Sequence, residues 1–452
     1  MGKKRFSLSS TQIIMLSFLL TIIIGSILLA LPVSWADGNS IPYIDALFTA
    51  TTATCVTGLV TVPIVSTFSF FGQCVILLLI QIGGLGIITV ISGIMILLHR
   101  KISFSDRILL QDAFNLDTLS GLVRFVKKVF KGTFIIETIG ALLYMIVFVP
   151  QFGIRGIWIS IFNSVSAFCN AGIDIFADNS LCNYATNPII NIVTCLLIIL
   201  GGIGFIVWWD IIRIYKKIKT HGLKAFKFLT LHSKIAISAT LFLIFVGAFL
   251  FFIFEYNNPA TIKNLSLFDK IQVCLFQSVT TRTAGFATVP QQNFTNATSF
   301  VSILLMFIGG SPVGTAGGIK TVTLAILVAA SFSAIKGNNE TVLWQRTISK
   351  TAISKAISVI NMSFSILFIS TILLSVVCDA APLDIIYETV SATATVGLTR
   401  GITPTLNIWG KIIITATMYL GRVGPISLAF AFNFKKTTKN KIQNPIEKIS
   451  VG

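Results

Sequence analysis

Four short segments that end in glycine recur at nearly equal distances along this chain of 452 residues. They read Cys55-Val56-Thr57-Gly58, Cys169-Asn170-Ala171-Gly172, Arg282-Thr283-Ala284-Gly285 and Ala394-Thr395-Val396-Gly397. The four glycines are separated by 114, 113 and 112 residues. A fixed period of this kind indicates an internal repeat, and we therefore predict four structural copies.

Backbone carbonyl groups are the chemistry that these segments offer. Glycine accepts positive φ angles, so the carbonyls of successive residues can point the same way. Four such strands around an axis would form rings of oxygens that replace the hydration shell of a cation. None of the segments holds a carboxylate, which favours a large monovalent cation over a divalent one. The alternative is that the glycines only allow close packing of helices, but their common register favours a filter.

The composition of the chain places such a filter in a membrane. Hydrophobic residues make up 54% of the chain and charged residues 11%, against roughly 45–50% and about 25% in soluble domains. A soluble fold of this size could not bury so much apolar surface. The same figures exclude intrinsic disorder and a small secreted module stapled by disulfides. We therefore expect a polytopic membrane protein.

The basic residues mark one side of that membrane. The net charge is +18, and 26 of the 34 Lys and Arg residues fall in five stretches. These are residues 3–5, 100–131, 213–234, 336–355 and the chain from 435 onward. The alternation follows the positive-inside rule and predicts cytoplasmic N- and C-termini in a multi-pass protein of the cell membrane. No base-reading element accompanies the basic clusters, so nucleic-acid binding is disfavoured.

Each basic stretch but the last is followed by an apolar span, a short polar segment and a second apolar span. The first spans are 12–31, 132–150, 233–254 and 352–374, and the second are 70–98, 188–215, 300–335 and 408–434. The segments between them, 41–54, 156–168, 267–281 and 383–393, are too short to cross and predict re-entrant helices. The run 12–31 could be a signal peptide cleaved near Ala36, but it exceeds the roughly 7–15 apolar residues typical of one.

The expected fold is all-α, with four pseudo-symmetric helix–pore-helix–filter–helix repeats. Eight transmembrane helices and four re-entrant pore helices would surround one central pore. The repeats cover residues 1–98, 99–215, 216–335 and 336–434, followed by a cytoplasmic tail over 435–452. A second glycine register, at Gly83, Gly201, Gly309 and Gly421, falls at matching places in the second spans and supports this division.

The second span of the third repeat is anomalous. Its 36 residues would form a helix of about 54 Å, well beyond the roughly 30 Å of a hydrocarbon core. Residues 309–320 contain five glycines and Pro312, which predicts broken backbone that lines a cavity. A phosphate-binding loop is disfavoured, because Ile319 separates Gly318 from Lys320 and no strand precedes it.

From residue 12 to residue 434 the chain resembles the Trk/Ktr/HKT superfamily of potassium transport proteins. The resemblance rests on four motifs, which are residues 55–58, Asn170-Ala171-Gly172, residues 281–286 and residues 395–398. Plant relatives with Ser at the first filter glycine resemble sodium carriers, whereas this chain has Gly58. Only eleven residues precede the first span, while Trk-type subunits carry an extra helical pair there. The Ktr type is therefore the closer match.

The resemblance implies potassium uptake through a channel-like pore, with K⁺ held at the filter as the one metal ion and no covalently bound cofactor. Na⁺ stays open as an activator or co-ion. The implied filter residues are Cys55, Val56, Thr57, Gly58, Asn170, Ala171, Gly172, Thr283, Ala284, Gly285, Thr395, Val396 and Gly397. The implied intramembrane gate consists of Gly309, Gly310, Ser311, Pro312, Gly314, Thr315, Gly317, Gly318, Lys320 and Arg422.

Two arginines fall within the apolar part of the chain. Arg422 lies in the middle of the last span, where a cation is costly unless it faces a cavity or a partner. The resemblance places it across the pore from the gating loop, bonded to loop carbonyls; a structural clamp between helices is the alternative. Arg282 would repel cations if it lined the filter, so we expect it to point behind the filter toward Glu388. This pair would support the filter.

Partners also follow from the resemblance. It implies a homodimer that sits on a cytosolic nucleotide-binding regulatory ring. The basic loops 100–131 and 213–234 and the C-terminal tail are the expected docking surfaces. Anionic headgroups of membrane lipids are the alternative contact for these loops.

Other functions are less well supported by the sequence. The three histidines form no cluster, and the spans hold no nucleophile–base pair or acidic dyad, so an enzyme is disfavoured. The alternative function is a Na⁺- or H⁺-coupled secondary transporter, for which Glu137 is a candidate proton site. Glu137 could instead cap the cytoplasmic boundary or hydrogen-bond a neighbouring helix. A scaffold without transport conflicts with the four filter segments.

Overall fold

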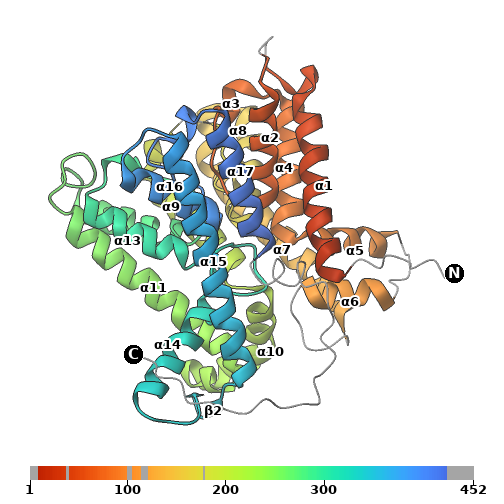
Figure 1. Cartoon of the computed structure of the whole chain (residues 1–452), viewed down its shortest axis with the longest axis vertical. Helices are drawn as coiled ribbons and strands as arrows, with labels where there is room; N and C mark the ends of the chain where they lie inside the picture. Colours follow the sequence, from red (N-terminus) through yellow and green to blue (C-terminus); the bar gives the residue numbers. More distant parts are fainter. Residues whose placement is uncertain (1–8, 37–39, 99–103, 114–120, 177–178, 425–452) are drawn as a thin grey trace.

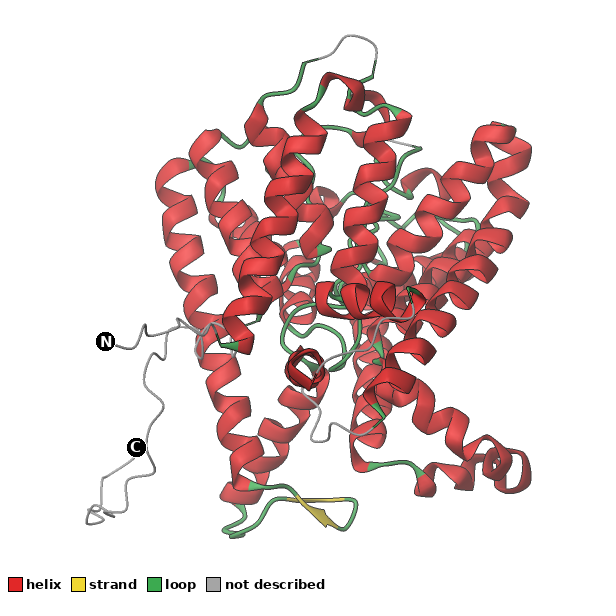
Figure 2. Ribbon diagram, turned by 90° about the vertical axis from the view of Figure 1, so that its right-hand side faces the viewer, coloured by secondary structure: helices red, strands yellow, loops and turns green. Residues whose placement is uncertain are grey.

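The computed structural model describes residues 9–36, 40–98, 104–113, 121–176 and 179–424. The expected tail 435–452 and the end of the last expected span, beyond Gly424, lie outside the described residues. Helices dominate, and Figure 2 shows them enclosing loops near the middle of the molecule. The strands within the described ranges are β1 (Val342–Leu343) and β2 (Arg346–Thr347), which pair antiparallel. The expected all-α class is confirmed.

Four long apolar helices begin the four repeats. They are α1 (Ser10–Ala30), α7 (Leu122–Phe152), α11 (Leu231–Glu255) and α15 (Lys350–Val377). Each is long and apolar enough to cross a membrane. They expose large side chains such as Leu20 and Phe242, as lipid-facing helices do. Hydroxyl groups of Ser9, Thr230 and Ser349 cap three of their N-termini. The four expected first spans are therefore present.

Four shorter helices follow, each packed on the long helix before it. They are α2 (Tyr43–Cys55), α8 (Ile154–Cys169), α12 (Leu267–Thr280) and α16 (Pro382–Ala394). Their C-terminal halves are buried. Because they hold 13 to 16 residues, they span only about 20–24 Å. Each ends where a filter segment begins.

The second spans of the first two repeats differ from the prediction. Unbroken helices were expected over 70–98 and 188–215. In the first repeat the chain instead bends by 97° between α4 (Phe70–Leu85) and α5 (Ile87–Leu97). In the second it bends by 96° between α9 (Pro188–Gly202) and α10 (Phe205–His221). Gly86 and Gly204 stand at these bends with φ angles of 84° and 95°. Residues with a side chain rarely adopt such angles, so glycine ends the helix there.

The third repeat has a longer break, and the last described helix of the fourth repeat also ends at a glycine. In the third, α13 (Asn296–Phe307) and α14 (Thr321–Ile335) are separated by residues 308–320. In the fourth, α17 (Ile408–Val423) ends at Gly424, whose φ is 89°. The predicted interruption in the third repeat is present, and it is longer than the bends of the first two repeats.

Smaller elements complete the described part of the chain. They are α3 (Ile64–Thr67), α6 (Phe104–Ala113), η1 (Pro32–Ser34), η2 (Cys182–Tyr184), η3 (Gly222–Phe228), η4 (Gln291–Asn293) and η5 (Thr403–Thr405). Helices α5 and α6 lie side by side next to the lower end of α1 (Figure 1). Asp112 of α6 borders a cavity that α1 and α5 also line.

Candidate cation filter and intramembrane gate

The four filter glycines meet in a closed ring. A Cβ atom added to any of them would lie 2.2–2.6 Å from a carbonyl oxygen of the next repeat, and that carbonyl belongs to the residue just before the next glycine. The pairs are Gly58 with Ala171, Gly172 with Ala284, Gly285 with Val396 and Gly397 with Thr57. The last pair returns to the first repeat, so the four segments surround one axis.

The backbone of the filter explains why these positions are glycine. All four glycines have φ between 64° and 103°, and no Cβ would fit against the neighbouring carbonyl. The residue two positions before each glycine is also left-handed, with φ between 52° and 67°; these are Val56, Asn170, Thr283 and Thr395. Two positive φ angles in each segment give the four strands one shared conformation.

Hydroxyl groups of the short helices hold three of the four strands from behind. The N–H of Gly58 donates to Oγ1 of Thr52 at 2.9 Å, and the N–H of Gly397 donates to Oγ of Ser391 at 3.0 Å. In the second repeat, Oγ of Ser166 accepts from the N–H of Ile173 at 3.1 Å. Since these N–H groups are engaged behind the strand, they do not compete for the carbonyls at the ring. Our sequence analysis missed these hydroxyls, although each lies six residues before a filter glycine.

The third strand is held differently. Here Oγ1 of Thr280 donates to the carbonyl oxygen of Phe286 at 2.6 Å. The N–H of Ala284 donates to the carbonyl of Thr280, four residues back, where the other three repeats use a span of five. The four copies are therefore similar but not identical.

The second glycine register brings the second helices against the ends of the short helices. A Cβ on these glycines would lie 1.9–2.1 Å from a carbonyl oxygen four residues before the filter glycine, in the pairs Gly83 with Thr54, Gly201 with Phe168 and Gly421 with Thr393. In the third repeat, a Cβ added to Gly309 would instead lie 2.0 Å from the carbonyl oxygen of Gly317. The loop 308–320 thus replaces a helix-to-helix contact.

Two cavities lie on opposite sides of the filter and the loop. An outer cavity of about 320 Å³ is bordered by all four filter glycines. An inner cavity of about 230 Å³ is bordered by loop residues Val313 and Lys320 and by Arg422, together with parts of α1 and α5. No residue borders both of these cavities. The ring and the loop separate them.

Backbone hydrogen bonds hold the loop 308–320 against the second repeat. Ser311 N–H donates to the carbonyl of Gly202 at 2.8 Å, and Thr315 N–H donates to that of Gly201 at 3.1 Å. The N–H of Phe205, just after the bend, donates to the carbonyl of Val313 at 2.8 Å. The loop therefore docks on the bend that Gly204 creates.

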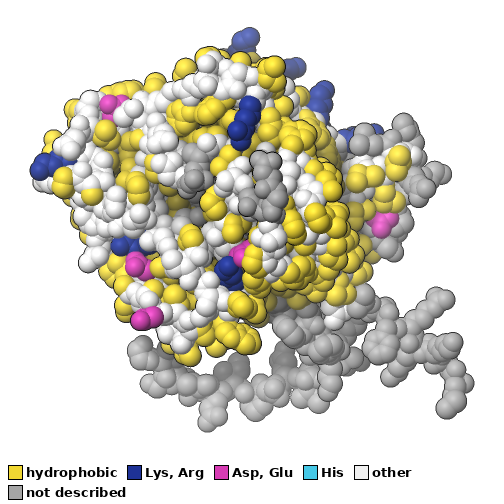
Figure 3. All heavy atoms as spheres, turned by 90° about the horizontal axis from the view of Figure 1, so that it is seen from above, with side chains coloured by type: hydrophobic (Ala, Val, Ile, Leu, Met, Phe, Trp, Pro, Cys, Tyr) yellow, Lys and Arg dark blue, Asp and Glu magenta, His cyan; other side chains and the backbone are white. Residues whose placement is uncertain are grey.

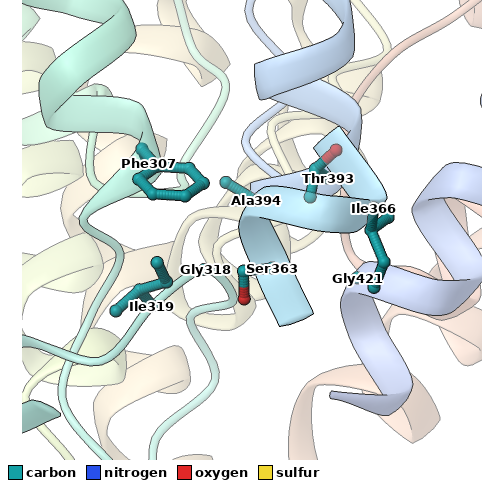
Figure 4. A pocket seen from close by; sticks show the side chains of 8 residues that line it. All are labelled: Phe307, Gly318, Ile319, Ser363, Ile366, Thr393, Ala394 and Gly421. Atoms are coloured by element: carbon teal, nitrogen blue, oxygen red, sulfur yellow. The ribbon is translucent and has the colours of Figure 1, made fainter. Parts of the chain in front are cut away.

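The upper side of the loop contacts the filter strands. Gly317 N–H donates to Oγ1 of Thr283 at 3.1 Å, and a Cβ on Gly317 would lie 1.9 Å from Oγ1 of Thr395. Oγ1 of Thr315 donates to the carbonyl of Phe168 at 3.0 Å. Figure 4 shows Gly318 and Ile319 lining one pocket together with Thr393, Ala394 and Gly421 of the fourth repeat. The loop lies directly under the ring.

Two basic side chains bond to the loop. Arg422 donates from Nη1 to the carbonyl of Thr315 at 2.7 Å and from Nη2 to the carbonyl of Gly83. It stands where the other repeats have Gly84, Gly202 and Gly310, one residue after the register glycine. Nζ of Lys320 donates to the carbonyl of Ala316 at 2.6 Å. Arg422 therefore joins the loop to the first repeat across the axis.

The expected pairing of Arg282 with Glu388 is wrong. The Arg282 side chain points behind the filter, as expected, but it donates to the carbonyl and Oγ1 of Thr240 in α11, at 3.4 and 3.2 Å. Glu388 accepts from the hydroxyls of Thr399, at 2.7 Å, and Thr403. Arg282 and Glu388 are therefore bonded to separate sets of neutral groups: Arg282 to oxygens of Thr240, and Glu388 to two threonine hydroxyls.

Glu137 lies in the interior of α7, fifteen residues after its first residue, and its side chain is buried. Its Oε2 accepts a hydrogen bond from Nε2 of Gln81 in the neighbouring helix α4 at 3.2 Å. Its backbone carbonyl accepts from Oγ of Ser164 in α8 at 2.6 Å. The expected hydrogen bond to a neighbouring helix is present.

Comparison with known proteins gives a consistent result. Residues 4–442 match the TrkH family, described as cation transport protein. The chain is 41% identical to Ktr system potassium uptake protein B of Bacillus subtilis over 98% of this chain and 96% of that protein, and 38% identical to potassium/sodium uptake protein NtpJ of Enterococcus hirae over 99% and 98%. The crystal structure of the potassium transporter TrkH from Vibrio parahaemolyticus matches with a TM-score of 0.74, at 16% identity, over 96% of this chain and 86% of that chain.

Proposed function

The chain belongs to the TrkH family of cation transport proteins, and from this premise we propose that it carries potassium ions into the cell through one central pore. The family consists of membrane ion transporters and not of enzymes, and the chain is a multi-pass membrane protein. The similar proteins of known function are named for potassium uptake. That substrate is carried over to this chain as part of the proposal.

The closed ring of four glycines is the observation that carries the proposal. It supplies main-chain oxygens from four segments at one level and no carboxylate. Rings of carbonyl oxygens replace the water around a weakly hydrated monovalent cation. The C-terminal ends of the four short helices, which carry partial negative charge, lead into the ring and favour a cation there.

The loop 308–320 is proposed as the gate of this pore. Its bonds to Gly201, Gly202 and Thr283 keep it between the filter and the inner cavity. Arg422 fixes the loop and adds a positive charge to the path. We propose that conduction requires the loop to leave these contacts, and that Arg282 and Glu388 support the filter through their separate partners.

Partners and orientation are also proposals. The names of the similar Ktr system proteins support a potassium uptake system with more than one component. We propose a homodimer on a cytosolic nucleotide-binding ring, with both termini cytoplasmic and with the basic loops 100–131 and 213–234 as docking surfaces. Coupling to Na⁺ or H⁺ is the alternative mode of transport. An obligatory symporter would give no unitary conductance at fixed voltage, whereas the proposed pore would.

Growth of a potassium-transport-deficient cell on limiting potassium tests the proposed function. Cells that express this chain should grow and accumulate radioactive rubidium, and a regulatory subunit should raise the rate. Cells that express the chain in the membrane but take up no more rubidium than empty cells would contradict the proposal.

A further inference from the structure

A carboxylate borders the outer cavity just above the filter ring. Asp174 follows Gly172 by two residues and lines the same cavity of about 320 Å³ as the four filter glycines. Seen from above, the face that carries α3 shows scattered charged side chains of both signs among hydrophobic and uncharged atoms (Figure 3). Among the described residues that line the cavity, Asp174 alone carries a formal charge.

The chain around Asp174 directs this side chain toward the cavity. Ile173 and Ile175 are each 1% exposed and belong to the hydrophobic core, whereas Asp174 is half-buried. The N–H of Ile173 is bonded to Oγ of Ser166, which fixes the segment behind the filter. Asp174 itself lines the cavity, so the half-buried carboxylate faces this space from between two isoleucines of the core.

A thiol lies near Asp174 on the wall of the same cavity. Cys182 lines the cavity as well, and its Sγ donates to the carbonyl of Ala287 at 3.5 Å. Burial, and after it the nearby Asp174 carboxylate, raise the pKa of Cys182 to about 11. Asp174 and Cys182 thus border the same cavity.

The other three repeats have no charge at the corresponding position. Two residues after their filter glycines stand Val60, Ala287 and Thr399, and all three line the same cavity. The basic side chains Arg400 and Lys411 are paired with Asp384 and Asp45, at 2.6 and 2.5 Å. Because these cations are paired with carboxylates, their charge opposes that of Asp174 little. A carboxylate beside a concave wall of low dielectric constant focuses negative electrostatic potential into the cavity.

We propose that Asp174 and the outer cavity form a cation-binding site that collects hydrated K⁺ ahead of the filter. The inference rests on the proposed function. At about 30 Å³ of liquid volume for each water, the cavity holds on the order of ten water molecules, so an ion there keeps most of its hydration. Such a site raises the local concentration of cations by charge and does not distinguish K⁺ from Rb⁺.

Uptake kinetics of charge variants test this site. Asp174→Asn should raise the half-saturating K⁺ concentration about five- to tenfold at low ionic strength, with the preference between K⁺ and Rb⁺ unchanged. Asp174→Glu should resemble the wild type. Asp379→Asn is the matched control, because Asp379 is exposed and does not line this cavity.

Salt dependence separates a charge effect from a structural one. Raising choline chloride from about 10 to about 300 mM shortens the screening length from roughly 30 to 6 Å. The added salt should raise the half-saturating K⁺ concentration of the wild type toward that of Asp174→Asn. The half-saturating K⁺ concentration of Asp174→Asn should stay nearly unchanged. Moving the charge to another repeat, in Asp174→Asn/Ala287→Asp, should restore both the affinity and the salt dependence.

Three results would overturn the inference. They are an Asp174→Asn affinity within twofold of Asp379→Asn, a wild-type salt response retained in Asp174→Asn, and a relocated charge at position 287 that restores neither property in a variant present in the membrane. Absence of uptake by the wild-type chain would instead refute the proposed function.

Discussion

The guanidinium group of Arg422 donates a hydrogen bond of 2.7 Å to the carbonyl oxygen of Thr315, at the middle of the loop beneath the filter. Its second nitrogen bonds to Gly83 in the first repeat. A charged side chain from the fourth repeat thus ties a loop of the third repeat to a helix of the first. This contact links three repeats, and it is the reason why we propose Arg422 as the latch of a gate.

Replacing Arg422 should open the pore. A hydrogen bond to a charged group contributes roughly 1.5–3 kcal/mol, so Arg422→Ala should raise the open fraction of a mostly closed pore by about tenfold or more. Initial rates of rubidium uptake into proteoliposomes measure this, with Arg422→Lys as the variant that keeps the charge. Unchanged or lost flux in a stable Arg422→Ala protein would show that Arg422 is a structural clamp and not a gate.

Thr283 should connect the gate to the filter. Its Oγ1 accepts from Gly317 N–H at 3.1 Å, and Thr283→Val leaves that buried N–H without a partner, at a cost of about 1–3 kcal/mol. We expect faster rubidium uptake and weaker discrimination against Na⁺. Thr21→Val is the control, because the Thr21 hydroxyl bonds only within its own helix, to Ser17. Equal effects of the two variants would refute the connection.

Arg282 and Glu388 should behave independently. Because Arg282 bonds to Thr240 and Glu388 to Thr399 and Thr403, their changes in stability should add within about 0.5 kcal/mol. Thermal unfolding of Arg282→Ala, Glu388→Gln and the double variant measures the coupling. By contrast, Arg282→Ala and Thr240→Ala should couple. A large coupling between Arg282 and Glu388 would restore the pairing that we expected from the sequence.

The recurrence of four similar glycine segments could be recognised in the sequence because the constraints on these glycines act on the backbone. Gly58 and its three counterparts have positive φ angles and approach a carbonyl too closely for any side chain. Such positions leave glycines at fixed intervals, and these can be read without coordinates. The long first helices were predictable for a similar reason, since hydrocarbon thickness sets the length of an apolar run.

The bends at Gly86 and Gly204 could not be predicted in the same way. Each glycine lies inside an apolar run whose hydropathy continues through the bend, so length and composition suggest an unbroken span. The turn is stabilised by contacts with distant segments, such as the bond from Phe205 N–H to Val313. The partner of Arg282 was missed because a buried guanidinium can donate to neutral oxygens as well as to a carboxylate, and the sequence does not show which of them is within reach.

Substitution of one ring glycine tests the central claim most directly. The measurement is the K⁺ concentration that half-saturates uptake by Gly58→Ala, with radioactive rubidium as the tracer. The control is Gly337→Ala, since Gly337 has φ of 70° but no atom within 4 Å of an added Cβ. Both changes strain the backbone, but only the first places a methyl group 2.6 Å from the Ala171 carbonyl oxygen. A Gly58→Ala concentration raised more than tenfold, with Gly337→Ala near the wild type, is the predicted result. Equal and unchanged values for both variants would contradict a filter built from the glycine ring.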